Sequence, residues 1–231
     1  MTDILQSFCS FIESAEFPCV GAKSALARDA LTLLAVGAID SPASDVEIHR
    51  ALNAFSASLD PDSPIVRSFV AIFDGPDGLG EEAFETALWN RLQSLHNLDV
   101  VSGQAWSEVV NADPDSPHFS LSIGGEPFFV IGLHPHASRP ARRFEKPALV
   151  FNSHLQFEKL RADGRFEKMK EIIRTRDAAL AGDINPMLDD HGDASEARQY
   201  SGRAVDEDWK CPFAPQDVVP GKEKTRQEDV A

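Results

Sequence analysis

The spacing of apolar residues predicts several helices along the chain. In the segments 3–15 and 81–99 they recur every three or four residues, a period that places them on one helical face. The run 24–39 follows a turn that contains Pro and Gly, and it is also expected to be a helix. Ser44 and Glu47 have the spacing of a capping box, which predicts a helix beginning near residue 45.

Shorter apolar runs predict strands. The β-branched run 65–73 is typical of a buried strand. The segments 118–124 and 126–134 flank a Gly-Gly pair, which is a hairpin signal, and 146–152 is a further apolar strand. We therefore expect an α+β fold, a single domain with a largely antiparallel sheet of at least four strands flanked by helices.

A helix is predicted directly after the last of these strands. Ser153 and Gln156 have capping-box spacing, so the helix begins at His154. Asp163-Gly164 is expected to divide it into two pieces. The basic residues between its apolar positions are interpreted as a solvated face.

The C-terminal part of the chain has little periodicity. The block 182–213 carries the only Tyr, a Trp and a Cys-Pro-Phe sequence, so we expect a long ordered loop segment packed on the domain. From residue 214 the composition is that of a disordered tail. The predicted organisation is one domain, 1–213, and a tail, 214–231.

Charge limits the partners that the chain can bind. The formal net charge of −15 repels nucleic-acid backbones and anionic membranes and attracts a cationic substrate. The one basic cluster comprises Arg139, Arg142, Arg143 and Lys146, and it is either a solvated turn or a clamp for an anion such as a propionate. No apolar run is long enough to span a bilayer, and the first residues lack the features of a signal peptide, so we expect a cytoplasmic protein.

The cysteines do not indicate a disulfide framework or a structural zinc site. Cys9, Cys19 and Cys211 show no CxxC spacing and no even pairing. Cys19 is either a thiolate ligand or a small buried residue, and the second interpretation is favoured because free cysteine is commonly buried.

Histidines near the predicted strand ends are the best metal-ligand candidates. His134 and His136 form a His-x-His pair that would face one side of a strand and suit a non-heme metal, and His154 begins the following helix, where an imidazole stays neutral. Additional candidates are His191, Asp189 and Asp190.

Several motifs together resemble a known family. The run HPHASRPARRFEKPALVFNSHLQFEKLR, the earlier FPCVGAK, and the later INPML, HG, SEARQYSGR and WKCPF are similar to the YqcI/YcgG family over residues 17–213. That family includes heme-dependent N-hydroxylases of guanidine-containing metabolites in guanitoxin and D-cycloserine pathways. The resemblance implies heme b, activation of O2, an external electron donor, and hydroxylation of a nitrogen of a small guanidino or amino compound.

The resemblance also suggests roles for individual residues. His134 is the first choice for the axial iron ligand, with His154 second and Cys211 as a thiolate alternative. Arginines are proposed to pair with heme propionates or a substrate carboxylate: Arg139, Arg142, Arg143 and Arg203. Glu196, Tyr200 and Ser201 are expected on the distal side, where Glu196 would accept a cationic guanidinium.

Two alternative functions remain open at this point. The chain has no flavin, ferredoxin or nicotinamide motif for electron supply, which is compatible with a heme-binding or heme-responsive protein that has no oxygenase activity. A non-heme metal enzyme would use His134, His136 and an acid. The residues do not fix the oligomeric state, and a homodimer is one option.

Overall fold

The computed structural model describes residues 2–60, 62–183, 185, 187 and 192–217. Its helices are α1 (Thr2–Glu13), α2 (Val20–Ala27), α3 (Asp45–Ala57), α4 (Glu81–Val101), α5 (His154–Ala162), α6 (Arg165–Ala181) and α7 (Ala197–Tyr200), with short 3-10 turns η1 (Pro42–Ser44) and η2 (Pro140–Arg142). Its strands are β1 (Leu31–Val36), β2 (Ser68–Phe73), β3 (Leu121–Ile123), β4 (Glu126–Leu133) and β5 (Ala148–Ser153).

The five strands form one sheet in the order β1-β2-β5-β4-β3. The β2–β5, β5–β4 and β4–β3 pairs are antiparallel, and β1 alone runs parallel to its neighbour β2. The predicted α+β domain with a largely antiparallel sheet of at least four strands is thus confirmed.

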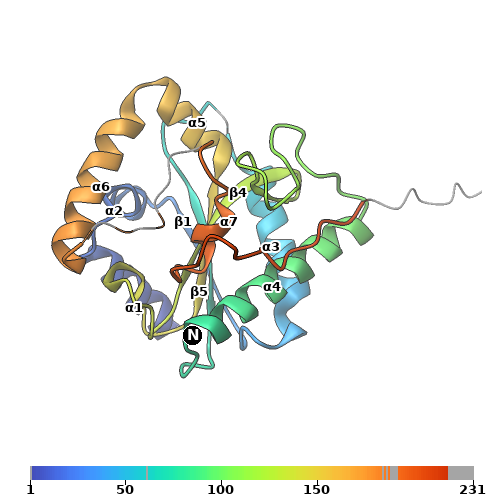
Figure 1. Ribbon diagram of the computed structural model, residues 1–231, viewed down its shortest axis with the longest axis horizontal. Coiled ribbons are helices and arrows are strands. Elements are labelled where there is room, and N and C mark those ends of the chain that lie inside the picture. Colours follow the sequence, from blue (N-terminus) through green and yellow to red (C-terminus); the bar gives the residue numbers. More distant parts are fainter. Residues whose placement is uncertain (1, 61, 184, 186, 188–191, 218–231) are drawn as a thin grey trace, which may run out of the picture.

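Helices cover both faces of the sheet (Figure 1). The helices α1, α2, α5 and α6 lie on one side of the strands, and α3 and α4 lie on the other. The side chains of β2 alternate between two hydrophobic clusters, so that Val70 packs towards α1 and Phe69 and Phe73 pack towards α3 and α4. Every residue of β2 is buried, because both faces of this strand are covered.

The hairpin between β3 and β4 depends on its two glycines. Gly124 and Gly125 have φ angles of 64° and 74°, the left-handed values that a two-residue hairpin turn requires. Asp99 of α4 accepts a hydrogen bond from the Gly124 N–H at 2.7 Å, which ties the turn to the helix layer. The Gly-Gly hairpin signal is confirmed.

The predicted second helix over 24–39 is wrong. α2 ends at Ala27, Asp29 adopts a φ of 56°, and Leu31–Val36 forms the edge strand β1. A short apolar run fits either a buried helix or a buried strand, and here pairing with β2 decides the outcome.

Of the two predicted capping boxes, neither forms completely. α3 begins at Asp45 as expected, but the Ser44 hydroxyl accepts a hydrogen bond from the Gly37 N–H at 3.2 Å and caps no helix. Ser153 does cap α5, because its hydroxyl accepts from the Gln156 N–H at 3.2 Å. The Gln156 side chain accepts from the Arg67 N–H at 2.8 Å, so it joins α5 to the segment before β2.

The later chain follows the predicted order. Gly164 separates α5 from α6 with a φ of 70°, which confirms the expected break. In the C-terminal segment, Phe213 is 4% exposed and packs beside His96 at a ring distance of 5.3 Å. The predicted tail falls mostly on residues 218–231, outside the part of the chain that the structure describes.

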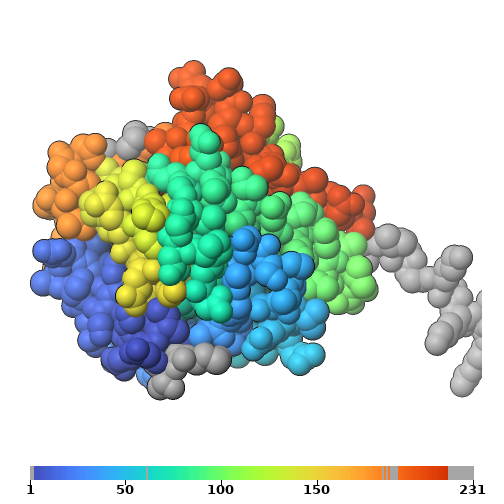
Figure 2. Space-filling model, turned by 90° about the horizontal axis from the view of Figure 1, so that it is seen from below, coloured from blue at the N-terminus to red at the C-terminus, as the bar shows by residue number. Residues whose placement is uncertain are grey.

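One face of the molecule joins three distant parts of the sequence (Figure 2). The first helix (dark blue), the turn after β4 (yellow) and the start of α4 (teal) lie side by side there. Ser138 of the turn donates its N–H to Glu81 of α4 at 2.9 Å, and Ser7 of α1 is hydrogen-bonded to Glu145. Among the described helices, none has the length and apolar character needed to cross a membrane.

Candidate cofactor and substrate cavity

A cavity of about 380 Å³ lies between the sheet and the helices α1, α2, α5 and α6. Its walls are mainly apolar, and its volume falls within the range of small-molecule and cofactor sites. The floor is made by cross-strand pairs of β4 and β5: Phe129 with Asn152, and Ile131 with Val150. We refer to this space as the sheet cavity.

His134 does not line the sheet cavity. Odd-numbered residues of β4 face the cavity as far as Leu133, and His134 is turned to the opposite side. There it stacks on Phe84 of α4 with a ring distance of 4.3 Å and is only 1% exposed. Burial lowers the pKa of His134, and its Nδ1 atom has no hydrogen-bond partner among the described residues. The imidazole is therefore neutral and belongs to the α4 side of the sheet.

The expected His-x-His pair on one strand face is wrong. β4 ends at Leu133, so His134 and His136 follow the strand, with His134 buried and His136 exposed. Among the residues that the structure describes, no group of three His, Cys, Asp or Glu side chains is placed to hold a metal ion. His191, Asp189 and Asp190 lie outside the described residues.

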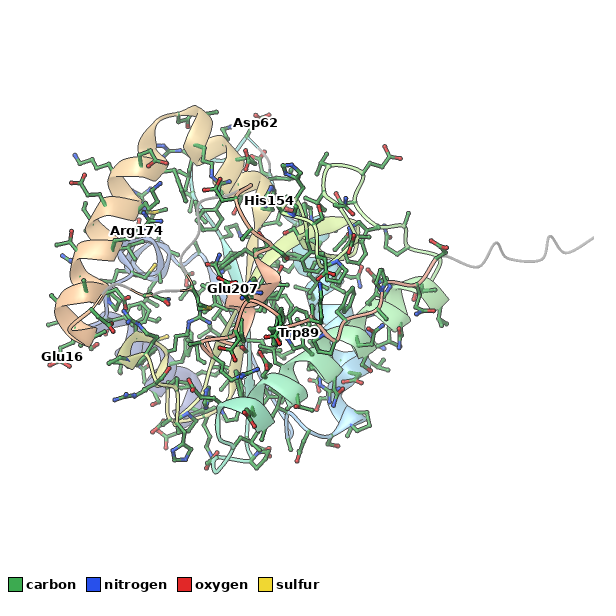
Figure 3. All side chains as sticks on the ribbon, in the orientation of Figure 1. Glu16, Asp62, Trp89, His154, Arg174 and Glu207 are labelled. Atoms are coloured by element: carbon green, nitrogen blue, oxygen red, sulfur yellow. The ribbon has the colours of Figure 1, made fainter. Side chains whose placement is uncertain are left out.

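His154 is the histidine that contributes to the cavity wall. It is the first residue of α5, is 7% exposed, and lies 3.5 Å from Glu158 through its Nε2 atom. Figure 3 labels His154 near the start of α5 and Arg174 on α6, and both residues line the sheet cavity. His154 also borders a surface pocket formed by the segment 106–112. His154 thus separates the sheet cavity from the exterior.

Two of the four predicted arginines reach the cavity. Arg142 donates to the Tyr200 carbonyl at 3.1 Å and more weakly to the Gly132 carbonyl at 3.4 Å. Burial lowers the pKa of Arg142 to about 10, which still leaves the guanidinium charged at neutral pH. Arg139 forms ion pairs with Asp177 and Asp183, so its charge is already matched by acids.

The other two arginines have structural partners away from the cavity. Arg143 donates to the carbonyls of Ala137 and Ser138, both at 2.7 Å, and so closes the turn after β4. Arg203 binds Glu85 of α4 in a two-pronged contact at 2.6 and 2.9 Å.

A buried carboxyl group lines the cavity on its α7 side. Glu196 is 8% exposed, and its Oε1 atom accepts hydrogen bonds from Ser120 at 2.7 Å and from the Tyr200 hydroxyl at 2.6 Å. Burial raises the pKa of Glu196 to about 7, so the group can change its charge near neutral pH. Tyr200 lies behind Glu196, where burial first and the carboxyl second raise the pKa of the phenol. Ser201 instead donates to Glu85 at 3.0 Å.

The cysteines occupy different places. Cys19 lines the cavity and accepts a hydrogen bond from the Ala22 N–H at 3.4 Å, which caps α2. Burial raises the pKa of the Cys19 thiol. Cys211 packs against the α3 and α4 side, and burial raises its pKa to about 12. Both groups are thiols at neutral pH, which makes a thiolate iron ligand unfavourable without a further stabilising charge.

The sequence interpretation missed three basic residues of the cavity. Arg161, Lys170 and Arg174 line it, although they were assigned to a solvated face. The signal was present in the spacing, because Lys170 and Arg174 follow Phe166 at intervals of four, on the same side of α6. Five basic and two acidic side chains line the cavity: Arg139, Arg142, Arg161, Lys170 and Arg174, with Asp177 and Glu196.

The class of protein defined so far is an α+β domain with a mainly apolar cavity between the sheet and one helix layer, lined by basic groups, a histidine and a buried carboxyl. The sequence model of the YqcI/YcgG family matches residues 8–214, and the chain belongs to this family. Two relatives from Bacillus subtilis (strain 168) are similar to it, both described as uncharacterized. YcgG is 29% identical over 208 residues, covering 86% of this chain and 81% of the relative. YqcI is 28% identical over 208 residues, covering 86% and 80%. No solved structure is significantly similar to the chain.

Proposed function

We propose that this protein is a heme-dependent oxygenase that hydroxylates a nitrogen of a small guanidino or amino compound. The observation that carries the proposal is the sheet cavity, which combines apolar walls, a histidine, a group of basic side chains and a buried carboxyl. Membership in the YqcI/YcgG family gives the chemical expectation.

The residues present fit the chemistry of heme b. This group needs an apolar slot, an iron ligand and cationic partners for two carboxylates. His154 is the residue that would bind the heme iron, because it is the histidine that lines the cavity, whereas His134 lies on the other side of the sheet. Arg142 is the proposed propionate partner, since its buried guanidinium binds only backbone carbonyls among the described residues.

When bound, the heme iron would supply the site for O2 activation. Around it, Glu196 is proposed to receive the cationic end of the substrate, because its carboxylate faces the cavity while Ser120 and Tyr200 hold Oε1 in place. A cation beside Glu196 lowers its pKa and favours the charged form. The reaction also requires electrons from an external donor.

Heme binding is tested first with the full chain. Expression with a heme precursor, or titration of the purified chain with hemin, should give a Soret band. His154→Ala should lose it and recover it with added imidazole, while His134→Gln and the exposed His136→Ala should keep it. Loss of the band in His134→Gln alone would make His134 the iron-binding residue instead of His154, and no Soret band under any condition would refute the whole proposal.

Catalysis requires a second test. The heme-loaded protein should be supplied with O2, a surrogate reductase and arginine-like guanidino compounds, and the products examined by mass spectrometry for one added oxygen atom on nitrogen. Product that is lost in Glu196→Gln supports the oxygenase. A stable heme complex that turns over no guanidino or amino compound would instead indicate a heme-binding protein without oxygenase activity.

A further inference from the structure

The strand β1 lies at one edge of the sheet, where β2 alone pairs with it, in a parallel register. Two hydrogen bonds show how its backbone is oriented. The Ala30 carbonyl accepts from the Ser68 N–H at 3.2 Å, and the Val36 carbonyl accepts from the Asp74 N–H at 3.1 Å. Both carbonyls belong to even-numbered residues, so the even-numbered residues of β1 direct their backbone groups towards β2.

The odd-numbered residues of β1 direct their backbone groups away from the sheet. These residues are Leu31, Leu33 and Ala35. Among the described residues, no group donates a hydrogen bond to their carbonyls or accepts one from their N–H groups. The three residues are only partly buried, whereas the neighbouring strand β2 is buried throughout. A row of N–H and carbonyl groups is therefore open along this edge.

The opposite edge of the sheet is protected. β3 has only three residues, and the Leu121 N–H donates to the Tyr200 hydroxyl at 3.2 Å. Ser107 of the preceding segment donates its N–H to the Ser122 hydroxyl at 3.0 Å. Short strands, covering segments, charged side chains, prolines and bulges are the usual ways in which a sheet edge is blocked. β1 has none of these, because its six residues pair without a bulge and include no charged residue and no proline.

The chain around β1 is also free of charge. The segment 30–39 contains no Asp, Glu, Lys or Arg, although the whole chain carries a net charge of −15. Two copies that meet at this edge therefore bring no like charges into contact. The side chains are apolar on both faces, since Leu33 packs towards α1 and Leu34 packs towards α3 and α4. The edge thus offers apolar contacts above and below its open backbone groups.

We propose that β1 is the interface of a homodimer, in which the β1 strands of two copies pair antiparallel and join the two sheets. A two-fold axis between the two copies of Leu33 places Leu31 opposite Ala35 of the second copy. These pairs are of the hydrogen-bonded kind, so every open group of both strands finds a partner. A second copy is favoured over an unrelated strand because it brings the same uncharged edge in matching register. Since the β3 edge is covered, the assembly stops at two copies.

The dimer also brings the second copy to one end of the sheet cavity. Leu31 lines this cavity, on the α1 side of the sheet. In the proposed register, Ala35 of the second copy lies opposite Leu31 on the same face. The interface does not depend on which ligand the cavity binds, so it is tested separately from the proposed function.

Sedimentation of the full chain over a series of concentrations tests the interface, and wild type should form a dimer. Ala35→Pro removes an outward N–H group and leaves the hydrogen bonds between β1 and β2 in place, because proline is tolerated on the open side of an edge strand. It should raise the dissociation constant of the dimer by roughly 100-fold or more. Ala35→Ser is the matched control, because it keeps the N–H group and should remain dimeric.

A charge exchange tests the register without relying on the proline variant. Leu33→Lys and Leu33→Glu each place like charges opposite one another at the two-fold axis, so each variant alone should be monomeric, with circular dichroism to verify that it is folded. An equal mixture of the two should recover the dimer, because opposite charges then face each other.

Three results would overturn the proposal: a wild-type chain that stays monomeric, one that grows into open-ended assemblies, and a dimer that neither Ala35→Pro nor the Leu33 variants weaken. Failure to bind heme would refute the proposed function and leave the dimer standing.

Discussion

The buried carboxyl group of Glu196 should make the free energy of unfolding depend on pH. Its pKa rises from an ordinary value of 4.5 to about 7 in the folded protein, chiefly because burial disfavours the charged form. The folded state therefore holds a proton that the unfolded state releases between these two values. Stability contributed by this group is complete below pH 4.5 and is lost as the pH rises towards 7.

The size of the effect follows from the two pKa values. Each pKa unit corresponds to about 1.4 kcal/mol. The raised pKa of Glu196 therefore lowers the free energy of unfolding by about 1.4 kcal/mol at pH 5.5 and by about 3.3 kcal/mol at pH 8, relative to low pH. Glu196→Gln removes the titration but keeps an oxygen that can accept from Ser120 and Tyr200. Relative to wild type, the variant should gain about 2 kcal/mol of unfolding free energy between pH 5.5 and pH 8.

Urea unfolding at several pH values measures this difference. Titrations of all other groups are common to both proteins and cancel in the comparison. Glu171→Gln, at an exposed position of α6, is the control for exchanging a carboxyl group for an amide. A difference between Glu196→Gln and wild type that stays constant from pH 5.5 to pH 8 would refute the raised pKa of Glu196.

Three further outcomes are expected. Gly132→Ala should lower the unfolding free energy by about 1–3 kcal/mol in urea titrations, because its Cβ would lie 2.7 Å from Phe84 Cε1. Asp45→Ala should cost about 3–5 kcal/mol in the same assay, since it leaves the buried Arg91 without its carboxylate. Burial lowers the pKa of His134, so stability is lost as the pH falls below its ordinary 6.5, and His134→Gln should reduce this loss in acid unfolding curves.

Much of the fold could be predicted from apolar spacing. α4 and α1 have a helical period over several turns, and β2 is apolar from Phe69 to Phe73, so local pattern and tertiary structure agree. β1 could not be predicted in this way. Five of its six residues are apolar and show no distinguishing period, and only its pairing with β2 makes it a strand.

The charge of the site could not be predicted from the charge of the chain. A net charge of −15 suggested a cationic ligand, yet five basic side chains surround the sheet cavity. Three of these come from α5 and α6, whose basic residues look like a solvated face until the cavity beneath them is known. This lining suits a ligand set with both anionic and cationic groups, such as the proposed heme with a guanidino substrate. It suits a purely cationic ligand, which the net charge suggested, less well.

The choice between His134 and His154 shows why a motif alone does not define a site. Along β4 the cavity residues are Phe129, Ile131 and Leu133. Because side chains alternate between the two faces of a strand, the side chain at position 134 points away from the cavity. Along β5 the facing partners are Val150 and Asn152, and the same count reaches His154. The sequence shows which residues of each strand share a face. The register of β4 against β5 and the helices that cover the sheet determine which of the two faces holds the cavity. His134 and His154 therefore lie on opposite faces of the sheet, and of the two only His154 lines the sheet cavity.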